Sequence, residues 1–226
     1  VIYLTSLIFN NIGFSATEIG LGFTISAILG TLTRLFTGNY LNRTGTIQFP
    51  LITSSIVSIT AGMFLIFSKD IFLYIIGQAL VGAAAGIYWP AAEFGIPYFC
   101  GPIDTRKAFA LVRSAEALGI FLGAFVGGFF TNFFYSKSIF VNDIFCMLVI
   151  IFLILKNNTS IRDIENFNKK LKEPIKSVQN KWNNNSLIII LSIILITTTL
   201  ALIQVTLPLD LVKGGVYRSE LSEKYI

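Results

Sequence analysis

The chain has 226 residues, of which 54% are hydrophobic and only 13% are charged. A soluble domain carries about 25% charged residues, so this chain has too little polar surface to cover a water-facing globule. It contains no histidine, which excludes Ser-His-Asp and Cys-His catalytic systems and His-ligated metal sites within this sequence. The composition predicts a protein that is solvated mainly by membrane hydrocarbon.

The start of the chain lies inside an apolar run rather than at a methionine, so we interpret the sequence as a fragment of a longer protein. The first residues lack the basic segment and the small-residue cleavage site of a signal peptide. The two cysteines, Cys100 and Cys146, lie in or beside apolar runs, and we expect both to be inert apolar thiols.

A helix that spans a bilayer needs about 20 mostly apolar residues. The connections between such segments are short, except for the polar, Asn- and Lys-rich residues 157–185. The fold expected is an all-α membrane protein: residues 1–156 form a six-helix half, 157–185 a linker, and 186–226 the start of a second half. In chain order the predicted helices are 1–11, which is incomplete, then 18–38, 48–68, 71–95, 106–133, 138–156 and 186–209, with residues 217–226 as a possible eighth.

The basic residues predict the orientation of these helices. If the first helix runs outward, the cytoplasmic connections hold Arg43, Arg106, Lys107 and the many lysines of 157–185. Cytoplasmic loops carry such an excess in membrane proteins, so we expect the linker to be cytoplasmic. We therefore interpret the net charge of +5 as a topology signal and expect no nucleic-acid partner. Binding of the linker to nucleic acid or anionic lipid is the minor alternative.

Residues 38–45 read GNYLNRTG and fall between the second and third predicted helices, on the cytoplasmic side. The stretch resembles the signature loop of the major facilitator superfamily, G-x-x-x-D-R-x-G-R-R. Gly38, Arg43 and Gly45 match, whereas Asn42 replaces the acidic residue. We expect Gly38 to let the helix end close to a neighbour, and Gly45 to allow a turn with positive φ. Arg43 would be a surface cation and Asn42 a helix cap or hydrogen-bond partner. A generic polar turn would have a similar composition.

Two further stretches resemble motifs of the same family. Residues 119–128 read GIFLGAFVGG and are similar to its fifth-helix motif G-x-x-x-G-P-x-x-G-G, with Ala124 in place of proline. Three of these glycines fall within about 80° of arc and predict a groove for a close helix neighbour. In the family this motif is associated with proton-coupled exporters. The matching residues are Gly119, Gly123, Gly127 and Gly128.

Residues 77–90 read GQALVGAAAGIYWP and resemble the fourth-helix motif R-x-x-x-G-x-x-x-G, which is followed by an aromatic residue and proline. Gly82, Gly86 and Pro90 match. Gln78 stands where the family has an arginine linked to proton transfer, and an amide cannot titrate. Ordinary close packing of helices would also explain the glycines of this stretch and of the fifth helix.

Charges inside a membrane are costly and mark candidate sites. Arg113 and Glu116 are three residues apart on the fifth helix and can pair. We expect either a structural ion pair that locks this helix to a neighbour or a proton and substrate path, to which Trp89 and Tyr88 would contribute. Glu93 is expected near the inner mouth, where it would help to form a gate.

The resemblance covers nearly the whole sequence and implies a secondary transporter that moves a small solute by alternating access. Proton-coupled efflux is favoured, solute–proton uptake is the alternative, and a transport-inactive fragment is a second one; a membrane-embedded enzyme is disfavoured. The expected partners are a small solute, protons and the lipid bilayer. We expect a monomer in the cell membrane, with no cofactor and no metal site.

Overall fold

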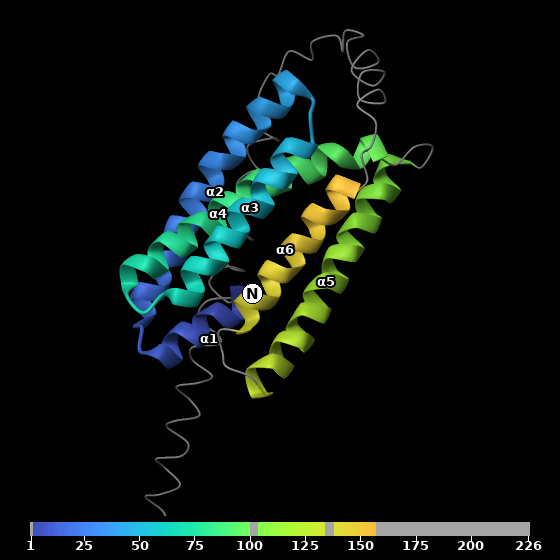
Figure 1. Ribbon diagram of the computed structural model, residues 1–226. Coiled ribbons are helices and arrows are strands. Elements are labelled where there is room, and N and C mark those ends of the chain that lie inside the picture. The colour runs from blue at the N-terminus through green and yellow to red at the C-terminus, as the bar shows by residue number, and fades with distance from the viewer. Residues whose placement is uncertain (1, 100–103, 134–137, 157–226) are drawn as a thin grey trace, which may run out of the picture. The chain divides into compact units, whose positions relative to one another are not determined.

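The computed structural model describes residues 2–99, 104–133 and 138–156, and within these ranges every regular element is an α-helix (Figure 1). The predicted linker 157–185, the predicted helix 186–209 and Cys100 lie outside the described residues. The helices are α1 (Ile2–Ile12), α2 (Ala16–Thr44), α3 (Gln48–Phe67), α4 (Ile71–Phe99), α5 (Thr105–Phe133) and α6 (Ser138–Lys156).

The described residues divide into two compact units, one of which contains residues 2–19 and the other the described residues between 20 and 156. In the first, the rings of Phe9 and Phe14 meet edge to face at 5.4 Å. Ser15 and Glu18 form a capping box: the Ser15 hydroxyl donates to the Glu18 carboxylate at 2.7 Å, and the Glu18 N–H donates to the Ser15 hydroxyl at 3.3 Å. This cap starts α2 at Ala16.

The second helix continues through Thr44, so the prediction that it ends at Gly38 was wrong. Threonine hydroxyls in its last turns bond to the preceding turn, as Thr37 does to the Thr33 carbonyl at 2.8 Å, and so need no outside partner. Gly45 ends the helix: its N–H donates to the Leu41 carbonyl at 2.8 Å, and its φ is +67°.

Four of the described helices are long and apolar enough to cross a membrane: α2, α3, α4 through Ile96, and α6 from Ile139. The fifth helix has 29 residues, which is ample length for a span. Its first half carries Arg106, Lys107, Arg113 and Glu116. No charged residue follows Glu116 in this helix.

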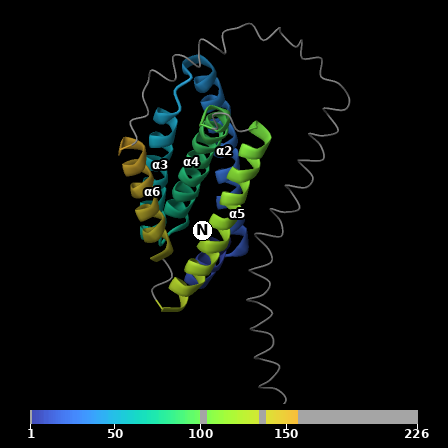
Figure 2. The same cartoon turned by 90° about the vertical axis from the view of Figure 1, so that its right-hand side faces the viewer.

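Within residues 20–156, α3 packs against α4 and α6, and α5 contacts both α4 and α6 (Figures 1 and 2). Glycine lets α3 approach α6, because a Cβ at Gly62 would lie 3.0 Å from the Ile144 side chain. Polar groups buried in α3 are satisfied locally, as the Ser55 hydroxyl donates to the Leu51 carbonyl at 2.9 Å. This packing holds α4 and α5 in position for the polar cluster described next.

Candidate functional site

The glycines of the fourth-helix motif form a contact between the backbones of α4 and α2. A Cβ added at Gly82 would overlap the Ser26 carbonyl of α2, and one at Gly86 would overlap Gly30 and Thr33. The Thr33 hydroxyl donates to the Leu29 carbonyl of its own helix at 2.8 Å and also lies 3.2 Å from the Ala83 carbonyl of α4. Glycine is needed here because any side chain would separate the two helices.

The other two residues of this motif have different surroundings. Gln78 is buried, with 3% of its surface exposed, and it hydrogen-bonds the side chain of Tyr74 one turn earlier on α4. Pro90 lies inside the helix, which continues to Phe99. The position where the family has an arginine is therefore occupied by a neutral amide within the helix packing.

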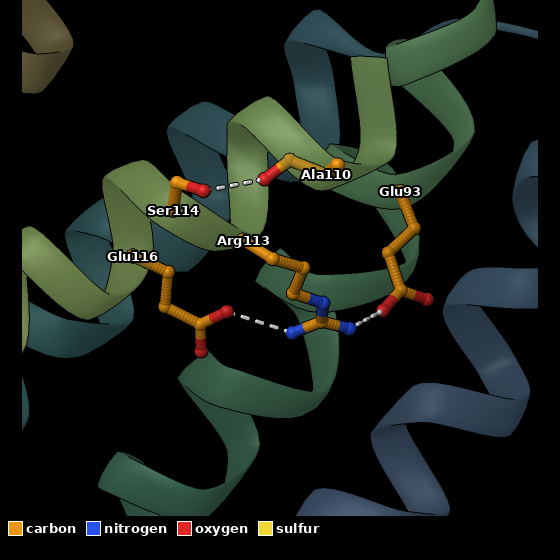
Figure 3. Close-up of polar contacts among 5 residues, drawn as sticks. All are labelled: Glu93, Ala110, Arg113, Ser114 and Glu116. Carbon is orange, nitrogen blue, oxygen red and sulfur yellow. Dashed lines mark hydrogen bonds and ion pairs between the residues drawn. The ribbon is translucent and has the colours of Figure 1, made fainter. Parts of the chain in front are cut away.

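Arg113 is the centre of a polar cluster between α4 and α5 (Figure 3). Its Nη1 donates to Glu116 Oε2 at 2.7 Å on the same helix, and its Nη2 donates to Glu93 Oε1 at 3.0 Å on α4. The guanidinium also lies 5.3 Å from the centre of the Trp89 ring, a cation–π arrangement. One side chain thus connects two helices and two carboxylates.

The exposure of the three side chains indicates how much these ion pairs contribute to stability. The side chains of Arg113, Glu93 and Glu116 are 56%, 48% and 31% exposed, respectively. Ion pairs that are exposed to water contribute little to stability, because solvent screens the charges. Where water reaches the cluster, Arg113 can therefore exchange partners at low cost in free energy.

The sequence predicted the pairing of Arg113 with Glu116, and the structure places these groups in contact. It treated Glu93 separately, as a residue of the inner mouth, and so missed that Glu93 is the interhelical partner. The sequence held one indication of this contact. Trp89 and Glu93 are four residues apart, so they share the face of α4 that Arg113 meets. Tyr88 packs edge to face on Trp89, with the ring centres 5.5 Å apart.

The glycine face of α5 is open in the described part of the molecule. Gly119 and Gly123 are exposed, and no atom of the described residues lies within 4 Å of a Cβ built at either position. Gly127 and Gly128 are within α5, but the surroundings of their side-chain positions lie outside what the structure describes. At Gly119 and Gly123, the close neighbour predicted for this face is not among the described helices.

The GNYLNRTG stretch is helical up to Thr44 rather than a loop. Gly38, Asn42 and Arg43 are exposed, and a Cβ at Gly38 would meet no described atom within 4 Å. The expected close contact at Gly38 is therefore absent among the described residues, whereas the positive φ expected at Gly45 is present. Among the same residues, no three His, Cys, Asp or Glu side chains come together to hold a metal ion.

Comparison with protein families assigns the chain to a known family. The family model of the Major Facilitator Superfamily matches residues 1–218. Searches of curated proteins and of solved structures return no significant match. The family match covers nearly the whole sequence and agrees with the all-helical fold and the four apolar helices of spanning length. The chain therefore belongs to the Major Facilitator Superfamily, whose members are multi-pass membrane proteins that act as secondary transporters.

Proposed function

We propose that this chain takes part in the efflux of a small solute in exchange for protons, by alternating access of a site near the middle of the membrane. The observation that carries the proposal is the sharing of Arg113 between Glu93 on α4 and Glu116 on α5. When one of the two carboxylates binds a proton, the guanidinium loses that ion pair and keeps the other. Such an arrangement can carry a proton without losing its fixed cation.

Glu116 is the candidate proton carrier, because it is the less exposed of the two carboxylates. When Glu116 binds a proton, the charge attraction that holds Arg113 along α5 is lost and the bond to Glu93 across the helices remains. Protonation would then favour the contact between α4 and α5. If the two sides of the membrane hydrate this cluster in turn, the proton would be taken up on one side and released on the other.

The direction of transport is supported by the glycine face of α5, since the motif that it resembles is associated with proton-coupled exporters. Its exposed Gly119 and Gly123 offer a smooth surface against which another helix could slide. Asn42, Gln78 and Ala124 depart from the family motifs, which is why solute–proton uptake and a transport-inactive chain are outcomes that the experiment must separate. We propose further that the protein acts as a monomer in the cell membrane, with residues 157–185 in the cytoplasm.

The test uses the full-length protein in proteoliposomes, with a panel of solutes screened for accumulation with and without a proton uncoupler. For any transported solute, Glu116→Gln should preserve solute binding and remove the dependence of transport on pH. Asp70→Asn is the matched control, because Asp70 is an exposed carboxylate in the connection before α4, away from the cluster. Its pH profile should equal that of the unaltered protein.

Three results would contradict parts of this proposal. An unchanged pH profile in Glu116→Gln would leave Glu116 with a structural role only. Failure of both Glu116→Gln and Arg113→Ala to accumulate in the membrane would make the pair a packing lock and place coupling elsewhere. Solute that moves in the same direction as the protons would establish uptake by symport, and no transport of any solute would favour an inactive chain.

A further inference from the structure

A lateral groove of about 220 Å³ lies between α2 and α3, with one wall contributed by α4. It occupies the last turns of α2 and the first turns of α3, next to the connection between these helices. It is separate from the Arg113 cluster, with which it shares no residue. Its lining consists of Thr33, Phe36, Thr37, Tyr40, Phe49, Pro50, Thr53 and Ile87.

The chemistry of the lining suits an apolar occupant. Phe36 and Phe49 are 73% and 62% exposed, and the rings of Tyr40 and Phe49 lie 5.6 Å apart. The hydroxyls of Thr33 and Thr37 donate to carbonyls of their own helix, at 2.8 Å each, and do not require a polar ligand. Because α2 and α3 both have the length and apolar composition of membrane spans, we expect the exposed face of the groove to meet hydrocarbon chains rather than water.

The charges around the groove indicate that a lipid bound there would carry an anionic headgroup. Between residues 20 and 68 the only charged side chains are Arg34 and Arg43, and there is no acidic residue. Arg43 is exposed and lies seven residues after Phe36, which places it within about 20° of the same direction and about 10 Å further along the axis. Arg34 lies about 180° from Arg43, on the opposite face of α2.

We propose that this groove binds one acyl chain of an anionic phospholipid, with the lipid phosphate held at Arg43. The chain would fill the space between Phe36 and Phe49, and the phosphate would reach the cytoplasmic end of α2. A fixed cation at the membrane surface favours an anionic over a zwitterionic lipid by about fivefold. Arg43 would be the headgroup contact because it lies at the end of α2 beside the groove, about 13 Å along the axis from Arg34.

The experiment reads lipid contact from a tryptophan placed in the groove. In the full chain, Trp89 and Trp182 are replaced by Phe, and a reporter is introduced as Phe49→Trp or, on the exposed surface of α6, as Phe152→Trp. Each protein is reconstituted in phosphatidylcholine with a small fraction of either brominated phosphatidylglycerol or brominated phosphatidylcholine, whose acyl bromines quench tryptophan on contact. Circular dichroism and gel filtration confirm that each variant is folded.

At Phe49→Trp, brominated phosphatidylglycerol should bind about fivefold more favourably than brominated phosphatidylcholine, whereas Phe152→Trp should show equal quenching by both. Arg43→Gln should abolish the preference at Phe49→Trp, and Arg34→Gln should leave it intact. Equal quenching by both lipids at both reporters would overturn the proposal, because it indicates ordinary boundary lipid. Absence of quenching at Phe49→Trp would also overturn it, since the groove would then be covered by protein.

Discussion

A positive φ of 67° at Gly45 explains why the end of α2 favours glycine. A side chain with a Cβ is strained in this left-handed conformation, whereas glycine adopts it freely. The neighbouring Gly38 has no such requirement, because it is exposed in the interior of the helix and meets no described atom. Two glycines of one motif therefore have different physical roles.

Gly45→Ala should lower the free energy of unfolding by about 1–2 kcal/mol, the cost of the left-handed conformation for an L-residue. Gly45→Asn should lose less, because asparagine tolerates this region. Both effects can be measured as changes in the denaturation midpoint of the purified protein in detergent. An alanine variant as stable as the unaltered protein would show that the turn does not need a positive φ.

At the scale of the elements, the glycines of α4 and α5 have different surroundings. On α4, Gly82 and Gly86 are in contact with the backbone of α2, so that the two helices form a close-packed pair. On α5, Gly119 and Gly123 face open space within the described part of the chain. The first pattern holds a pair of helices together, and the second leaves an open surface on α5 within the described part of the chain.

Gly82→Ala should therefore destabilise the protein by about 1–3 kcal/mol, because the new methyl group overlaps the Ser26 carbonyl and the helices must separate. Gly38→Ala, also in a helix interior, is the control and should be neutral or slightly stabilising. Thermal unfolding in detergent compares the two. Equal midpoints for both variants would contradict a backbone contact at Gly82.

Gly123→Leu should insert into the membrane and unfold at the same temperature as the unaltered protein, since no described atom opposes the new side chain. Transport should nevertheless be lost, because leucine prevents the close helix approach that we expect at this face during the transport cycle. Expression, melting temperature and solute flux distinguish these outcomes. Normal flux in this variant would remove the glycine face from the mechanism.

At the scale of the whole molecule, the distribution of basic residues predicts which connections face the cytoplasm. In a background with Cys100 and Cys146 replaced by Ala, Asn11→Cys should react with a membrane-impermeant maleimide in intact cells. Ser177→Cys, in the predicted cytoplasmic linker, should react only after the cells are opened. Labelling of Ser177→Cys from outside would reverse the predicted orientation.

The sequence by itself determined the class of protein, the family and most helix boundaries, because apolar length and glycine spacing are local properties of the chain. Prediction and structure agree closely for α3 and α6, but α2 continues past Gly38, since the polar residues of GNYLNRTG are also compatible with helix. The sequence paired Arg113 with Glu116 because helical spacing brings them together. Only the tertiary structure decided that Glu93 is the second partner, that Gly82 touches α2 and that Gly119 and Gly123 meet no described helix. These contacts join residues far apart in the chain, and they depend on how helices are placed side by side, which no local pattern specifies.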